Sequence, residues 1–191
     1  MHHKHLVKGV IAQFFYVGAQ VGVASFVIRF AQYTIPGTPE KMAANYLKLH
    51  LLGFMIGRFT GSAIIKHVAA PRLLSWFGFA ALTCLTIVLP ASGTAPIWAL
   101  VLLGLFHSIF FPTIFALSVK HLGPYSKLGS SFLVMAIIGA TVFPTSMGYI
   151  SDLSNIRCAF LVPLICHVYV LYFALRGHKP SASQIDLVYQ P

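Results

Sequence analysis

Polar side chains that interrupt otherwise apolar stretches are the first candidates for chemistry in this sequence. Gln13, Tyr16 and Gln20 are spaced by three and four residues, so they fall in one stripe of a helix. Two amides and a phenol donate and accept hydrogen bonds without bringing charge, which suits a polyhydroxylated ligand. The same residue types also bond membrane helices to one another. We favour a ligand-binding stripe, with interhelical bonding as the alternative.

A second polar pair, His107 and Ser108, lies in the middle of another apolar stretch, just over one turn before Pro112. A histidine at such a depth packs against other helices, contacts a ligand or carries a proton. We expect His107 and Ser108 to line the same ligand cavity as the stripe. Packing and proton relay stay open as alternatives.

Carboxylates and metal-binding clusters are absent from the apolar stretches. The three acids, Glu40, Asp152 and Asp186, fall in expected loops or in the tail, so no carboxylate carries a proton or binds sodium within a span. The histidines at positions 2–5 lack carboxylate or thiolate partners. The cysteines have no CxxC spacing and are interpreted as buried apolar residues. We therefore predict no metal site, no cofactor and no enzymatic activity.

The elements that carry these residues are membrane-spanning helices. Of 191 residues 58% are hydrophobic and only 8% are charged, and the mean hydropathy is +0.82. A soluble domain carries roughly 25% charged residues. Stretches near the 20 apolar residues or so that a membrane helix needs occur six times. The predicted fold is all-α and polytopic, with spans at Val10–Ile28, Leu49–Ile65, Leu73–Pro90, Ile97–Ser118, Phe132–Ile150 and Cys158–Leu175.

The cations predict how these spans are oriented. Six spans return the chain to its starting side, and that side carries eight cations: Lys4, Lys8, Lys66, Arg72, Lys120, Lys127, Arg176 and Lys179. The positive-inside rule places it in the cytoplasm of a cell whose inner membrane holds the protein. The net charge of +10 then records topology and predicts no nucleic-acid partner. We expect a cytoplasmic segment at 1–8, a six-helix domain at 9–176 and a cytoplasmic tail at 177–191.

Three further features concern packing and movement. Gly53, Gly57 and Gly61 are four residues apart, which predicts a tight pair with another helix. Each proline within a span removes a helical hydrogen bond and tends to kink its helix, and these prolines are Pro112, Pro144 and Pro163. Arg58 lies about two turns inside the second span. It either extends to the headgroups or makes a gating contact with a neighbouring loop, and both readings stay open.

The polar residues recur on the first and fourth spans, which are corresponding members of two three-helix groups. Inverted three-helix repeats with binding residues near the bilayer midplane form one half of a major facilitator transporter. The first and fourth spans would line the central path, and the almost purely apolar third and sixth spans would face lipid.

Several runs of the sequence are distinctive. They are GVIAQFFYVGAQVGVASF (Gly9–Phe26), GRFTGSAI (Gly57–Ile64), HSIFFPTIFALSVKHLGPYSKLGSSFLVMAIIGATVFP (His107–Pro144) and AFLVPLICHVYVLYF (Ala159–Phe173). They resemble the fucose–galactose–glucose:proton symporter family of the major facilitator superfamily, and they match only the C-terminal six of its twelve helices. In this resemblance Gly57 to Arg72 takes the place of the loop that latches the cytoplasmic gate.

The resemblance implies proton-coupled transport of a hexose or deoxyhexose by alternating access, with the proton-coupling carboxylates in the N-terminal half. His107 stands where relatives usually have Asn, and Ala24 where Trp is common. The resemblance therefore does not determine which sugar is preferred. We expect the chain to act as a C-terminal half, with a separate N-terminal half or a second copy as partner. The alternative is a truncated, non-transporting remnant or an interaction subunit of a split transporter.

Overall fold

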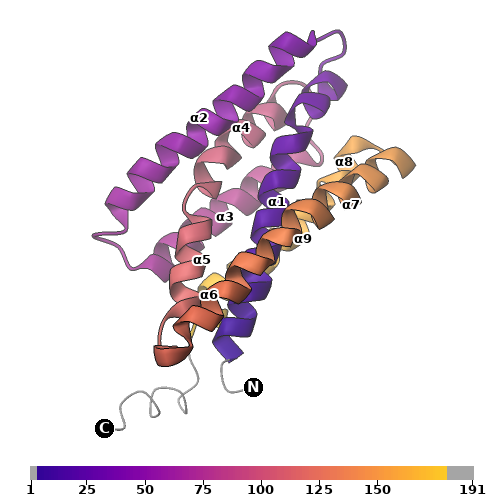
Figure 1. Cartoon of the computed structure of the whole chain (residues 1–191). Coiled ribbons are helices and arrows are strands. Elements are labelled where there is room, and N and C mark those ends of the chain that lie inside the picture. The colour runs from indigo at the N-terminus through magenta and orange to yellow at the C-terminus, as the bar shows by residue number, and fades with distance from the viewer. Residues whose placement is uncertain (1–3, 180–191) are drawn as a thin grey trace.

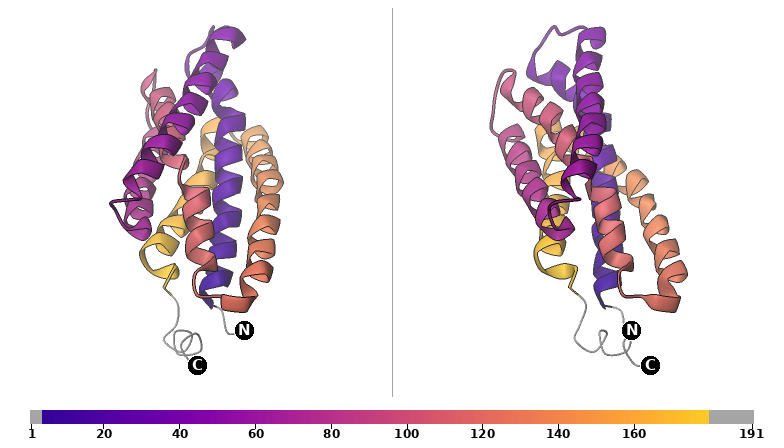
Figure 2. Two further views of the ribbon diagram at one scale, coloured as in Figure 1. Left: turned by 60° about the vertical axis from the view of Figure 1, so that its left-hand side comes forward. Right: turned by 90° about the vertical axis from the view of Figure 1, so that its left-hand side faces the viewer.

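Six helical segments run up and down through the bundle (Figures 1 and 2). The computed structural model describes residues 4–179, and this range contains helices and connecting turns without a strand. The first three segments are α1 (Lys4–Thr34), α2 (Glu40–Ile64) and α3 (Ala70–Val88). Each of the last three is divided into shorter helices. The fourth segment consists of α4 (Ala95–His107) and α5 (Phe110–Val119). The fifth consists of η1 (Gly123–Tyr125), α6 (Ser126–Met135), η2 (Ala136–Ile138) and α7 (Gly139–Leu153), and the sixth of α8 (Ile156–Ala159), α9 (Leu161–Tyr172) and η3 (Phe173–Gly177).

Each of the six predicted spans coincides with one of these segments, which confirms the all-α fold class. Five segments are long and apolar enough to cross a membrane. The exception is α2, in which Lys48, His50 and Arg58 dilute the apolar residues. Its 25 residues are nevertheless about 37 Å long, which exceeds the hydrocarbon core of a bilayer.

The helices extend beyond the apolar stretches that reveal them. We predicted the first span at Val10–Ile28, whereas α1 begins at Lys4 and continues to Thr34. The second was predicted from Leu49, whereas α2 begins at Glu40. Hydropathy marks only the part of a helix that lies in hydrocarbon, and the backbone stays helical through the headgroup region.

The prolines have three different outcomes. The fourth segment is interrupted at Ser108 and Ile109, because Pro112 has no N–H to donate to the carbonyl of Ser108. The helix α7 continues through Pro144, and the interruption of the fifth segment falls earlier, at Ala136–Ile138. Pro163 lies in the first turn of α9, where a missing N–H costs no helical hydrogen bond.

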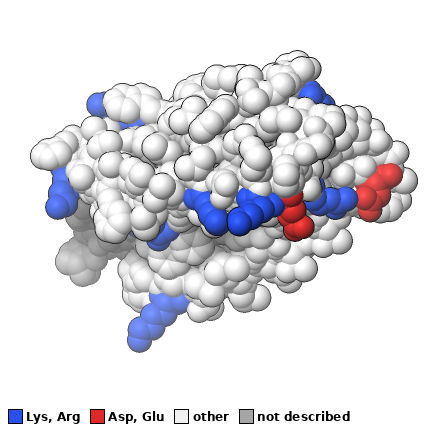
Figure 3. Space-filling model, turned by 90° about the horizontal axis from the view of Figure 1, so that it is seen from above, with Lys and Arg blue, Asp and Glu red and all other residues white. Residues whose placement is uncertain are grey.

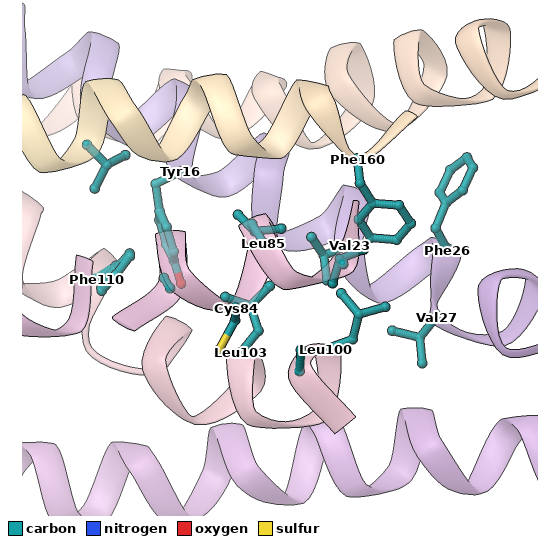
Figure 4. Close-up of a cluster of buried hydrophobic side chains, with 14 of the residues drawn as sticks. Tyr16, Val23, Phe26, Val27, Cys84, Leu85, Leu100, Leu103, Phe110 and Phe160 are labelled. Atoms are coloured by element: carbon teal, nitrogen blue, oxygen red, sulfur yellow. The ribbon is translucent and has the colours of Figure 1, made fainter. Parts of the chain in front are cut away.

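The helix α1 lies at the centre and packs against α2, α5, α7 and α9. Its inward side chains meet those of the surrounding helices in one apolar core, where Val23, Leu100 and Phe160 are fully buried (Figure 4). Aromatic edge-to-face contacts complete this core, with the rings of Phe30 and Phe160 4.9 Å apart. The core therefore holds the polar residues of α1 between apolar layers.

The two ends of the bundle carry different charges. The first residue of α1 and the last of η3 lie at one end, together with the loop between α2 and α3 (Figure 1). We call this the basic end, because all the cations assigned above to the cytoplasmic side lie in its helix ends and loops. The acids of the described range, Glu40 and Asp152, lie at the opposite end, which Figure 3 views from above with acids in red.

Candidate functional site

The helices α2 and α4 form the most extensive helix contact of the described chain. A Cβ atom added to Gly57 would meet the carbonyl oxygen of Leu105 and the hydroxyl of Ser108, and one on Gly61 would meet the Ile109 side chain. Gly104 of α4 receives the backbone of His50 in return. The glycines that sequence spacing singled out thus face α4 across the point where α4 ends.

Tyr16 links α1 to the same point. Its side chain is fully buried beside Phe110 (Figure 4), and its hydroxyl donates a hydrogen bond to the carbonyl oxygen of His107, 2.7 Å away. The His107 carbonyl lies at the last residue of α4, where the regular helical acceptors end. The Tyr16 hydroxyl is therefore engaged in interhelical bonding, one of the two readings that the sequence allowed.

His107 forms a pair with His167 of α9. The two Nε2 atoms are 2.9 Å apart, and the rings stack with centroids 4.9 Å apart. His167 Nδ1 lies 2.7 Å from the carbonyl oxygen of Pro163, which can only accept, so Nδ1 carries the proton. In neutral rings His167 Nε2 must then accept, and His107 Nε2 must donate. This assignment of tautomers leaves a lone pair on His107 Nδ1, which is buried without a partner in the described chain.

His50 of α2 is the third buried histidine of this cluster. Its Nδ1 donates to the carbonyl oxygen of Leu100, 2.6 Å away, and its ring stands edge-on to His107 with centroids 6.2 Å apart. Sequence analysis passed over His50 and His167. The signal that would have found them is the one that found His107, a histidine within an apolar stretch.

Gln13 lies one turn from Tyr16. Its two polar side-chain atoms, Nε2 and Oε1, are buried and have no hydrogen-bond partner in the described chain. On α5 the hydroxyl of Thr113 is also buried and unpaired. The antiparallel register of α1 and α5, set by the Gly9–Ser118 and Tyr16–Phe110 contacts, brings Gln13 to the level of Thr113. Buried amides and hydroxyls are normally hydrogen-bonded. The Gln13 amide and the Thr113 hydroxyl are therefore free to bond a further polar group at this level of the bundle.

Gln20 lies apart from the buried cluster, and Ser108 is fully buried but faces Gly57 of α2. Gln20 is partly exposed in a groove of about 330 Å³ between α1 and α2, which Val21, Leu47 and Leu51 also line. Ser108 donates to the carbonyl oxygen of Leu105, 2.7 Å away, and borders a different groove. The predicted stripe therefore divides, since Gln13 and Tyr16 point into the core and Gln20 opens toward α2.

Arg58 lies on the exposed side of α2, with its guanidinium carbon 5.8 Å from the centre of the Phe54 ring. It lines a groove of about 370 Å³ together with Ser108 and Thr113, bounded on the α5 side by Pro112. The groove follows the interrupted part of the fourth segment. Arg58 is thus placed beside the break between α4 and α5.

This fold and this site have counterparts among known proteins. The L-fucose-proton symporter of Escherichia coli is 42% identical over 172 residues, which cover 90% of this chain and 39% of that protein. The glucose/galactose transporter of Brucella abortus is 38% identical over 178 residues, which cover 93% and 43%. A crystal structure of the major facilitator superfamily transporter FucP in its outward conformation superposes with a TM-score of 0.90 at 41% identity. The match covers 93% of this chain and 43% of that one. No protein-family model matches the chain.

The chain is homologous to the C-terminal half of these transporters. It spans less than half the length of the curated relatives it matches. The six segments accordingly form half of a major facilitator fold, and the chain is a multi-pass membrane protein. The relatives are transporters rather than enzymes.

The buried polar side chains of this C-terminal half are imidazoles, amides and hydroxyls, and Arg58 adds an exposed cation on α2. Within residues 4–179 no group of three or more His, Cys, Asp or Glu side chains could hold a metal ion. Glu40 lies in the first turn of α2, Asp152 in the last turn of α7, and Asp186 lies outside the described residues. The described spans therefore offer imidazoles, amides and hydroxyls, but no carboxylate.

Proposed function

We propose that the chain works as the C-terminal half of a proton-coupled symporter for L-fucose or a related hexose such as galactose or glucose, by alternating access. The observation that carries this proposal is the 42% identity to an L-fucose-proton symporter over 172 residues, with the fold match to FucP at a TM-score of 0.90. In such a transporter two halves rock around a sugar held between them.

The partner in this proposal is an N-terminal half that supplies the proton-coupling carboxylates. Support comes from the described spans, in which Glu40 and Asp152 are confined to the end opposite the basic end. A second copy of the chain would also provide twelve helices, but it would bring no carboxylate into the membrane. Such a pair would support facilitated diffusion at most.

The sugar would meet the predicted residues in two ways. Gln20 has direct access from the groove between α1 and α2. The Gln13 amide and the His107 Nδ1 lone pair are buried, so a sugar hydroxyl reaches them only when α1 moves relative to α4 and α5. Tyr16 and Ser108 already bond to backbone carbonyls, and in this proposal they position their neighbours.

Arg58 would serve the gate at the basic end. Its guanidinium lines the groove beside the break between α4 and α5, where a cation can hydrogen-bond to exposed helix carbonyls of a partner half. The Gly57–Arg72 stretch would then form the latch. We place the basic end, with residues 1–8 and 177–191, in the cytoplasm and the six segments in the inner membrane.

The test is uptake of labelled L-fucose, galactose and glucose into proteoliposomes under an inward proton gradient. The full chain is reconstituted alone and together with the N-terminal half of a related L-fucose-proton symporter. We expect accumulation only in the second case. Accumulation by the chain alone would contradict the half-transporter proposal, and no uptake by the assembled pair would favour a non-transporting subunit.

The sugar contact is tested separately in the assembled pair. Gln20→Ala should weaken sugar binding about tenfold, because an amide that hydrogen-bonds a hydroxyl contributes about 1.4 kcal/mol. Thr83→Ala, on the exposed face of α3, is the matched control and should leave affinity unchanged. Equal affinities of the Gln20→Ala and wild-type proteins would remove Gln20 from the binding site.

A further inference from the structure

A cavity of about 550 Å³ opens at the basic end between the start of α3, the end of α5 and the end of η3. Its rim carries Lys120 and His121 from the turn after α5, and His178 and Lys179 from the residues after η3. We call these four residues and the cavity they border the basic pocket. None of the four belongs to the sugar site proposed above.

The charge of the basic pocket is not balanced by acids of the described chain. Glu40 and Asp152 both lie at the opposite end of the bundle. Burial lowers the pKa of the His178 imidazole, and the Lys179 and Lys120 cations lower it further, against its hydrogen bond to the Phe173 carbonyl, which raises it. Cations close enough to disfavour another positive charge create a site that favours an anion.

The start of α3 borders the same cavity. Ala70 and Pro71, which line it, open a helix of 19 residues. Pro71 has no N–H, and the amides of Arg72 and Leu73 donate to the Ala69 carbonyl, so this helix start contributes mainly the positive end of the helix dipole. Two lysines, two histidines and the positive end of a helix dipole therefore converge on one cavity.

The walls of the basic pocket are apolar. Ala70, Ala116 and Leu117 line it below the charged rim, and Ala70 and Ala116 also line the groove that runs along α5 toward Pro112. A small inorganic anion would gain nothing from this groove. An amphiphile places its charged group at the rim and its chains along α5.

The depth of the basic pocket matches a lipid headgroup. The apolar spans end here, with α3 beginning at Ala70, the fourth span ending at Val119 and the sixth at Gly177. Residues just beyond such ends lie in the headgroup region of a bilayer. Basic pockets between membrane helices at this level bind phosphate-bearing headgroups.

We propose that the basic pocket binds the phosphate of an anionic phospholipid, with Lys120, His121, His178 and Lys179 around the headgroup and an acyl chain against Ala116. The four basic residues lie outside the sugar site, and lipid binding is measured without transport, so the proposal does not depend on the transport activity proposed above. Lysines act on the phosphate as point charges, which accommodates headgroups of different shape.

The experiment measures binding of short-chain phosphatidylglycerol to the purified full chain, with phosphatidylcholine of the same chain length as the neutral probe. Native mass spectrometry counts the bound lipid. We expect wild-type protein to prefer phosphatidylglycerol, and Lys120→Gln/Lys179→Gln to bind it at least about tenfold more weakly, because both lysines around the phosphate are lost.

The matched control is Lys4→Gln/Lys127→Gln, which removes two exposed cations from the same end but outside the pocket. It should keep wild-type affinity. If both double variants lose affinity equally, the attraction comes from the net charge of the basic end, and the pocket is overturned. The same conclusion follows if wild-type protein binds the two lipids equally.

A further arm separates a lipid from a free phosphate. Ala116→Phe fills the apolar wall at an exposed position, where a larger side chain leaves the core intact. It should abolish the preference for phosphatidylglycerol and leave the affinity for inorganic phosphate itself unchanged. If inorganic phosphate displaces phosphatidylglycerol at equal concentration in wild-type protein, or if Ala116→Phe binds lipid normally, the acyl-chain part of the proposal fails.

Discussion

The first three segments of this bundle are continuous helices, whereas each of the last three is divided. The helices α1, α2 and α3 run without interruption for 31, 25 and 19 residues. The later segments break at Ser108–Ile109, at Ala136–Ile138 and at Phe160. The prolines are distributed differently in the two groups of segments. Those of the first three segments lie between helices or at helix ends, whereas Pro112 and Pro144 lie inside the fourth and fifth segments.

The continuous group supports the divided one at its central break. Tyr16 of α1 donates to the carbonyl oxygen of His107, and Gly57 of α2 lets the backbone of Leu105 and the hydroxyl of Ser108 approach. The break between α4 and α5 is therefore held in place by rods on two sides. The first three segments thus form a continuous frame, and the last three contain the helix breaks.

The largest effect on this frame is expected from Gly57→Ala. The added Cβ would collide with the Ser108 hydroxyl and with the Leu105 carbonyl, which is backbone of the neighbouring helix and cannot rotate away. We expect a loss of about 3 kcal/mol in the free energy of unfolding. Denaturant unfolding in detergent, followed by tryptophan fluorescence, measures it.

Gly148→Ala on α7 is the control for that substitution. A Cβ atom at Gly148 would meet nothing within 4 Å, so the variant should be as stable as wild type or up to about 1 kcal/mol more stable. Equal destabilisation by both alanines would mean that glycine flexibility, rather than close packing on α4, matters at Gly57.

The histidine pair within the divided group should give the next largest effect. His167→Phe removes the acceptor of the His107 Nε2 proton and leaves a buried donor unpaired, at a cost of about 2 kcal/mol. Replacing both rings, in His107→Phe/His167→Phe, should recover most of this loss, because no polar group is then left without a partner. A double variant as unstable as the sum of the single ones would show that the rings do not act as a pair.

The smallest effect is expected from Tyr16→Phe, which removes the bond between the frame and the break without changing the packed volume. A hydrogen bond between membrane helices contributes about 0.6 kcal/mol on average. Hydrogen exchange should rise locally at residues 107–111 and stay unchanged in α3. Unchanged exchange at the break would mean that Gly57 packing alone fixes α4 against α5.

Hydropathy predicted the six segments because lipid imposes one strong requirement, a run of about 20 apolar residues with its backbone bonds satisfied internally. It could not predict where helices end, since Lys4 and Thr34 are as compatible with a helix as with a loop in the headgroup region. Nor did it reveal the interruption of the fifth segment at Ala136–Ile138, which contains no proline. Pro144 marks a missing donor, but neighbouring bonds keep α7 helical there.

The candidate site was harder to predict, because the spacing of Gln13, Tyr16 and Gln20 fixes a stripe on α1 but not the helices that cover it. Lipid and protein cores are equally apolar, so the sequence carries little sign of which face is buried. Gln20 turned out partly exposed and Tyr16 fully buried within the same stripe. The His107–His167 contact joins residues 60 positions apart, which helical periodicity cannot reveal.

The lengths of the helices have a consequence for the surrounding bilayer. The spans Lys4–Thr34 and Gly123–Leu153 each have 31 residues and pack against one another. A helix of 31 residues is about 46 Å long, whereas the hydrocarbon core is about 30 Å thick, so both ends of each segment extend into the headgroup regions. The two segments can therefore tilt together in a thinner or thicker bilayer while their polar ends stay among the headgroups.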